Sequence, residues 1–109
     1  MKREFIRTQV FEEDWKSAGL DDDDLCDLEN FLMQNPKAGD MIPHLLGGRK
    51  VRYAASGHGK SGGVRVIYID IVIREHTYLL LAYPKNVQTD LTPEQKKALN
   101  KLIKKLKED

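Results

Sequence analysis

The most regular hydrophobic pattern lies in the second half of the chain, where runs rich in Val, Ile and Tyr alternate with short polar turns. Such runs predict consecutive strands of an antiparallel meander. The middle run is almost continuously apolar from Val64 to Ile73, which is typical of a central strand covered on both faces. Arg65 is the charged residue near its start. The three predicted strands span residues 49–56, 63–73 and 77–84.

Two segments have helical spacing and recognisable start signals. Asp21 can cap a helix that runs to about Asn35, and the acidic residues after it suit the positive end of the helix dipole. The run of four aspartates lacks the turn glycine of an EF-hand loop, so capping is the preferred interpretation over calcium binding. Cys26 is expected to pack within this helix, among leucines at helical spacing. Thr92, Pro93 and Gln95 provide an N-cap, a first helical residue and a capping box for the last helix.

The order of these segments predicts an α+β fold. A mostly antiparallel meander sheet would be flanked by N-terminal helices and a C-terminal helix, with an opening strand over residues 5–11. The chain of 109 residues has no internal repeat or low-complexity linker, and 40% of its residues are hydrophobic. Both the length and the composition are typical of one globular domain over residues 1–109.

Charge is distributed unevenly along the chain. Residues 1–48 carry a net charge of −6, whereas residues 49–109 carry +7, so a protein with an overall net charge of +1 can still present a basic face to a polyanion. A solvated mixture of charges remains the alternative. Because the sequence contains one cysteine, no signal-peptide core and no long apolar run, we expect a cytoplasmic protein without a membrane partner.

The glycine-rich segment 57–62 formally matches two nucleotide-binding motifs. The dinucleotide fingerprint and the Walker A loop both require a helix directly after the glycines, because the helix N-terminus receives the phosphates. A β-branched run follows here instead, and Ala54 stands where Walker A needs a glycine. Both interpretations are rejected, which leaves a hairpin turn or a loop that brings cations close to a phosphate.

Basic side chains gather around this loop. Arg52 and Lys50 should share one face of their strand and Arg49 the other, and the antiparallel order places this strand beside Arg65. Tyr83 at the end of the last strand could stack on a base or simply pack in the core. The candidate RNA-binding residues are Arg49, Lys50, Arg52, His58, Tyr83 and Asn86, and Lys60, Arg65 and Lys85 are further cations near them in the sequence.

Metal and nucleophilic chemistry find no support in the residue spacing. His44, His58 and His76 are isolated from one another, and no Ser-His-Asp or Cys-His arrangement emerges. Carboxylates are also scarce between residues 49 and 86. Any catalysis should therefore rest on lysine, arginine, tyrosine or histidine side chains, without a cofactor.

The blocks Gly59-Lys60-Ser61-Gly62-Gly63-Val64-Arg65-Val66-Ile67-Tyr68 and Tyr83-Pro84-Lys85-Asn86, in this order, strongly resemble HigB-type members of the RelE superfamily of bacterial toxins. The resemblance covers about residues 30–106. It implies a toxin that an antitoxin, expected to be a DNA-binding helix-turn-helix protein, holds inactive. It also implies a ribosome-dependent endoribonuclease, or mRNA interferase, that cleaves mRNA without a metal and so inhibits translation.

The same resemblance assigns roles to individual residues. Arg65 would stabilise the oxygens of the phosphorane, and Lys60 and Lys85 would act as further cations or proton carriers. The general acid and base stay unassigned. Two alternatives remain open at this point: a ParE-like toxin that binds DNA gyrase, and a non-catalytic relic that only binds its antitoxin.

Overall fold

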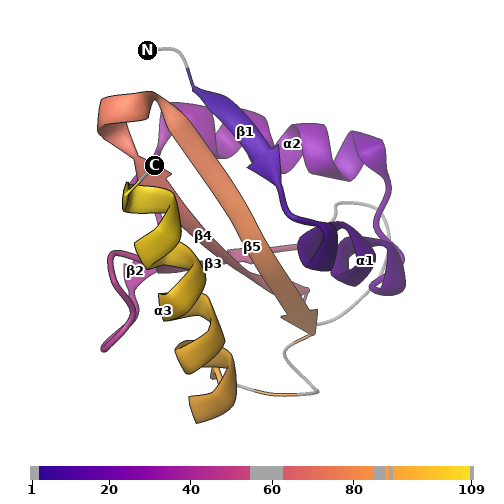
Figure 1. Cartoon of the computed structure of the whole chain (residues 1–109). Helices are drawn as coiled ribbons and strands as arrows, with labels where there is room; N and C mark the ends of the chain where they lie inside the picture. Colours follow the sequence, from indigo (N-terminus) through magenta and orange to yellow (C-terminus); the bar gives the residue numbers. More distant parts are fainter. Residues whose placement is uncertain (1–2, 55–62, 85–87, 89, 109) are drawn as a thin grey trace.

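The computed structural model describes residues 3–54, 63–84, 88 and 90–108. In these ranges the elements follow the order β1 (Glu4–Arg7), α1 (Gln9–Ser17), α2 (Asp22–Gln34), β2 (Asp40–Met41), β3 (Arg49–Tyr53), β4 (Val64–Ile71), a 3-10 turn η1 (Val72–Arg74), β5 (His76–Pro84) and α3 (Pro93–Glu108). Figure 1 shows the sheet as a twisted layer that the helices cover.

The five strands form one sheet in the order β1-β5-β4-β3-β2. The pairs β2–β3, β3–β4 and β4–β5 are antiparallel, so the predicted meander is confirmed, with β4 at its centre. β1 pairs with β5 in parallel, which makes the sheet mixed rather than antiparallel throughout. An irregularity between Ile67 and Tyr68 shifts the register of β4 against β5, a feature typical of a β-bulge.

Helices α1 and α2 cover one face of the sheet. Phe11 and Trp15 from α1 and Leu28 from α2 pack there against Val66 and Tyr68 of β4, and all five side chains are buried. Asp14 fastens α1 to β5, since its carboxylate accepts a hydrogen bond from the backbone N–H of Ala82 at 3.0 Å. Burial raises the pKa of the Asp14 carboxyl.

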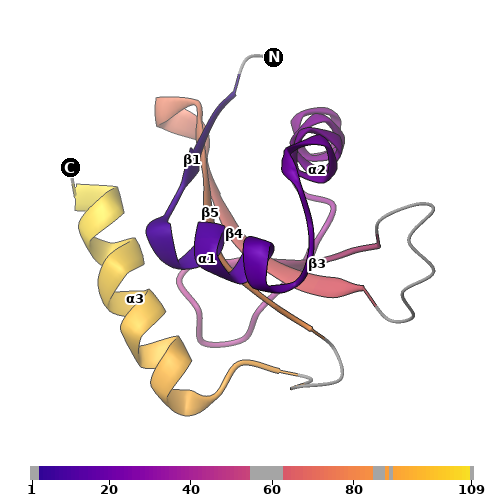
Figure 2. The same ribbon diagram turned by 90° about the vertical axis from the view of Figure 1, so that its right-hand side faces the viewer.

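Helix α3 covers the opposite face. Leu99 and Ile103 project from it into a second core that contains Ile67, Ile69 and Leu81 of the central strands. Figure 2, turned by 90°, shows α3 and α2 on opposite sides of the sheet. The continuous apolar character of β4 is thus explained by burial on both faces.

Both predicted helix starts are confirmed in detail. Asp21 and Asp24 form a reciprocal capping box at the start of α2. Thr92 and Gln95 do the same at the start of α3, where each side chain accepts the other residue's backbone N–H. These local signals fix where the helices begin, as the sequence predicted.

Three expectations were wrong. The predicted central strand ends at Ile71 instead of Ile73, because Val72–Arg74 form the 3-10 turn η1. The opening strand ends at Arg7 instead of continuing to Phe11, because the Thr8 hydroxyl accepts the N–H of Phe11 and caps α1 there. Cys26 does lie in α2, but its side chain is exposed instead of packed. The buried stripe of this helix consists of Leu25, Leu28 and Leu32, and Cys26 falls outside it.

Candidate phosphate-binding site

One row of functional side chains crosses the three central strands. Arg65 of β4 pairs with Arg52 of β3 on one side and with Tyr83 of β5 on the other. Directly paired residues on neighbouring strands point to the same face of the sheet, here the face that α3 covers. The strand pairing therefore brings together two of the three arginines that the sequence singled out, Arg52 and Arg65.

Arg65 lies in an unusual electrostatic environment. Its Nη1 atom is buried and has no hydrogen-bond partner among the described residues. The residue opposite it on β3 is the like-charged Arg52, a cross-strand arrangement that destabilises a sheet. Burying an unpaired cationic group also costs free energy. An anionic ligand would suit this position, because it could accept a hydrogen bond from Nη1 and offset the repulsion between the two arginines.

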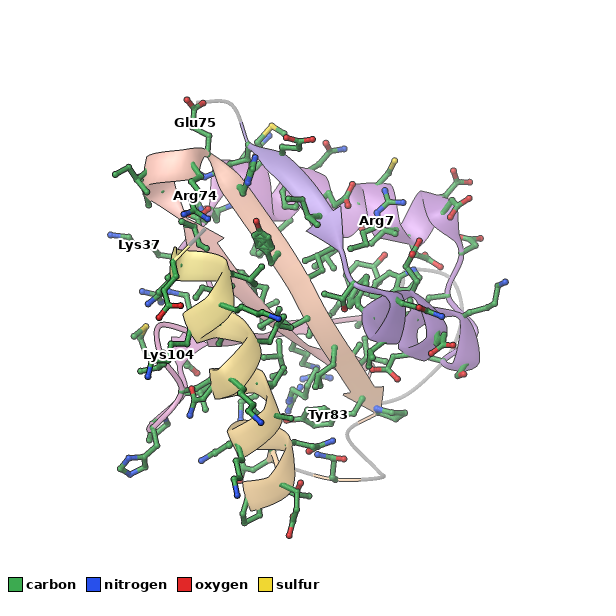
Figure 3. All side chains as sticks on the ribbon, viewed as in Figure 1. Arg7, Lys37, Arg74, Glu75, Tyr83 and Lys104 are labelled. Atoms are coloured by element: carbon green, nitrogen blue, oxygen red, sulfur yellow. The ribbon has the colours of Figure 1, made fainter. Side chains whose placement is uncertain are left out.

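Tyr83 lies at the end of this row. Only 5% of it is exposed, and its ring belongs to the core beneath α3, so the ring packs and is not available to stack on a base. Figure 3 places it between the end of β5 and the first half of α3. Burial raises the pKa of the Tyr83 hydroxyl, and Lys50 and Arg65 act against that rise. Asp90 is also near enough to influence the same hydroxyl.

Lys50 extends the basic row along β3 beyond Arg52. It shares the face of Arg52 because the two are two residues apart, and it pairs across the strands with Ile67. Its ammonium group forms an ion pair with Asp90 at 2.9 Å. The hydrogen bond and charge of Lys50 hold the pKa of the Asp90 carboxyl below its usual range.

Arg49 lies away from this row. Its side chain donates a hydrogen bond to the backbone carbonyl of Gly39 at 2.7 Å and a longer one to that of Lys37. Alternation predicts that Arg49 and Arg52 point to opposite faces of β3, and these bonds tie Arg49 to the loop after α2. The bonds give Arg49 a structural role, and its predicted contact with RNA stays a prediction.

Four of the sequence-predicted residues lie outside the described residues: His58, Lys60, Lys85 and Asn86. The first two belong to the segment that joins β3 to β4, and the others follow β5 in sequence. Gly63 stands at the base of that segment with φ +55, and a Cβ there would lie 2.2 Å from the carbonyl oxygen of Tyr53. Only glycine tolerates both conditions, so Gly63 fixes how the chain enters β4 beside Arg65.

Asp90 is the neighbour of the basic row that the sequence did not single out. It lies two residues before Thr92, the capping residue of α3, and is 40 positions away from Lys50 in the sequence. No local spacing therefore connects Asp90 with Lys50. Within the described ranges, no group of three or more His, Cys, Asp or Glu side chains could hold a metal ion. None of the helices described has the length and apolar character needed to cross a membrane.

Solved structures share this fold at low sequence identity. The chain is similar to the intact E. coli RelBE toxin-antitoxin complex, with a TM-score of 0.54, 13% identity and coverage of 73% of this chain and 93% of the other. It is also similar to a mutant of the E. coli toxin RelE in the free state, with a TM-score of 0.56, 13% identity and coverage of 81% and 88%. The chain therefore shares the fold of these two structures.

A comparison of the sequence with protein-family models identifies the family. Residues 3–108 match the family model described as the RelE toxin of the RelE/RelB toxin-antitoxin system. Because the match covers nearly the whole chain, the protein belongs to the RelE toxin family.

Proposed function

We propose that this RelE-family toxin is a ribosome-dependent, metal-independent endoribonuclease of the HigB type, which cleaves mRNA in the cytoplasm and thereby inhibits translation. The observation that carries the proposal is Arg65, a cation whose Nη1 atom is buried and lacks a partner among the described residues. It lies beside Arg52 and near the Tyr83 hydroxyl. A phosphate of the RNA would supply the anion that this row lacks.

The chemistry needs a group that stabilises negative charge on the phosphate as the ribose 2′-hydroxyl attacks it. A guanidinium that is already in place costs no reorganisation during the reaction, and loss of one such donor typically costs about 3 kcal/mol of transition-state stabilisation. We assign this role to Arg65. Lys60 and Lys85 are proposed as further catalytic cations or proton carriers, and Arg52 and Lys50 as phosphate contacts.

Arg49, His58, Tyr83 and Asn86 complete the proposed RNA-binding set. Tyr83 would act through its hydroxyl, because its ring is buried. A cognate antitoxin, proposed to be a DNA-binding helix-turn-helix protein, would hold the toxin inactive. The similarity to the E. coli RelBE complex supports an antitoxin as partner.

The test is a translation reaction from purified components, programmed with a defined mRNA and supplied with the protein. We expect cuts in ribosome-bound mRNA, with ends mapped at codon resolution. These cuts should persist at chelator concentrations that leave the ribosomes enough magnesium to function. The Arg65→Ala variant should cleave on the order of 100-fold more slowly while its ribosome affinity stays within about threefold of wild type.

The control is the same reaction without ribosomes, in which the mRNA should stay intact. Full activity in a stably folded Arg65→Ala protein would remove Arg65 from the mechanism. Inhibition of DNA gyrase without any mRNA cleavage would favour the ParE-like alternative. A protein that binds its antitoxin but neither cleaves mRNA nor affects gyrase would be the non-catalytic relic.

A further inference from the structure

The ion pair between Lys50 and Asp90 has an unusual position for a surface pair. The side chain of Asp90 is 78% exposed and that of Lys50 is 26% exposed. Exposed ion pairs contribute little to stability because water and salt screen them. The pair nevertheless involves a residue of the basic row, and Lys50, Arg65 and Asp90 all lie near enough to influence the Tyr83 hydroxyl electrostatically.

Asp90 is held in place by the start of α3. Its backbone carbonyl accepts a hydrogen bond from Gln88 Nε2 at 2.9 Å, and the same nitrogen donates to Gln95 Oε1. Gln95 in turn forms the capping box with Thr92. These hydrogen bonds connect the backbone of Asp90 to the start of α3, and the Asp90 carboxylate pairs with Lys50.

The spacing of the cations matches a polyanion. Lys50 and Arg52 are two residues apart on one strand, so their Cα atoms are about 6.6 Å apart. This distance is comparable to that between neighbouring phosphates of an extended strand of RNA. With Arg65 directly opposite Arg52, one phosphate can face the arginines while the next faces Lys50.

We propose that Lys50 is a second phosphate-binding position beside Arg65, and that Asp90 occupies it in the free protein as an internal competitor of RNA. The inference rests on the proposed function, because it assigns the neighbouring phosphate of the same RNA strand. Displacement is inexpensive: Lys50 exchanges a carboxylate for a phosphate, and Asp90 already faces water. Asp90 thereby weakens the binding of free RNA and favours RNA that other contacts, such as those on the ribosome, hold in place.

The experiment measures binding of a fluorescent 2′-O-methyl RNA oligonucleotide by anisotropy at several salt concentrations. This probe lacks the attacking hydroxyl, so the result does not depend on cleavage. Asp90→Asn should bind roughly three- to tenfold more tightly at low salt, with a log-log salt slope steeper by about 0.7 for one additional phosphate contact. Glu94→Gln is the matched control, because Glu94 is an exposed acid in the first turn of α3.

The double variant Lys50→Gln/Asp90→Asn makes the test specific to the pair. In the Lys50→Gln background, Asp90→Asn should give no more gain than Glu94→Gln. An equal gain from Asp90→Asn and Glu94→Gln in the wild-type background, or a gain that survives Lys50→Gln, would overturn the inference. If neither Lys50→Gln nor Arg65→Ala changes binding, the proposed RNA-binding face itself is wrong. Weaker binding by Lys50→Gln without a gain from Asp90→Asn refutes only the role of Asp90.

Discussion

Two arginines in different regions of this molecule meet opposite electrostatic conditions. Arg3, just before β1, forms two hydrogen bonds with Asp70 near the end of β4, and Thr77 donates to the same carboxylate. The side chains of this ion pair are 3% and 8% exposed. Arg65, at the other end of β4, has a buried Nη1 without a partner among the described residues.

The difference separates an arginine whose charge the fold pairs with a carboxylate from one that we propose binds a phosphate. A buried cation needs a compensating anion, and the fold supplies one to Arg3. At Arg65 the strand register supplies a second cation instead, Arg52. Four changes can break or sharpen this contrast.

The largest expected effect follows from Asp70→Ala. It leaves Arg3 buried without its carboxylate and removes the acceptor of Thr77, so we expect the free energy of unfolding to fall by roughly 3–5 kcal/mol. Urea denaturation measures it. Glu29→Ala, which breaks the more exposed pair with Arg7, is the control and should cost less than about 1 kcal/mol. Similar losses in both variants would show that burial does not distinguish the two pairs.

Substitution of Arg65, in contrast, should reduce cleavage while leaving the free energy of unfolding nearly unchanged. Arg65→Lys removes the planar guanidinium but keeps a charge, and we expect it to retain no more than about a tenth of the cleavage rate. Its free energy of unfolding should stay within about 1 kcal/mol of wild type, because Arg65 forms no ion pair with the residues that the structure describes. Cleavage of ribosome-bound mRNA and a urea titration report the two quantities. A large loss of stability would place Arg65 among the structural arginines.

Tyr68 tests the face of the sheet that α1 and α2 cover. Its buried hydroxyl accepts the N–H of Gly39 at 3.1 Å and donates to the carbonyl of Pro36 at 3.0 Å, so Tyr68→Phe should cost about 1–2 kcal/mol.

The pH dependence gives a second measurement on Tyr68. Burial raises the pKa of this hydroxyl in the folded protein. Its contribution is therefore complete below the ordinary tyrosine pKa of about 10 and is lost as pH rises through the higher folded value. Tyr68→Phe should lose less stability than wild type between neutral pH and high pH. Parallel curves of the two proteins would contradict this account.

The smallest effect belongs to Arg52→Gln. Removing a like charge opposite Arg65 should stabilise the protein by a few tenths of a kcal/mol, on the order of other cross-strand effects. The same change should reduce the magnitude of the salt slope for binding of single-stranded RNA by about 0.7. Thermal unfolding and anisotropy check both parts. A loss of stability would mean that Arg52 has a favourable contact that outweighs the repulsion.

Local signals in the sequence predicted a large part of the fold. Asp21 and Thr92 define helix starts through contacts within three residues, and the alternation of β3 placed Arg52 and Arg49 on different faces. The parallel pairing of β1 with β5 could not be predicted in this way, because it joins residues 72 positions apart. Thr8 showed no strong signal of the helix that it caps.

The candidate site shows the same difference between local signals, which the sequence reveals, and contacts between distant residues, which it does not. The scarcity of carboxylates between residues 49 and 86 led us to expect few acidic partners for Arg65 within the neighbouring strands, and its Nη1 atom has no hydrogen-bond partner among the described residues. Asp90, which lies beyond that range, reaches Lys50 only through the placement of α3. The burial of Tyr83 also depends on α3, so the choice between packing and stacking could not be made from the residue type.

The parallel pairing of β1 with β5 has a consequence for the order of events on the ribosome that makes the protein. The first strand to be synthesised finds its partner only when residues 76–79 have emerged. At roughly 5–20 residues per second, β1 waits on the order of 4 to 15 s for that partner. Because β5 also contributes to the cores on both faces of the sheet, neither core can be completed earlier. Sheet closure is therefore a late step of synthesis, and a nascent chain that stops before β5 has no folded toxin to release.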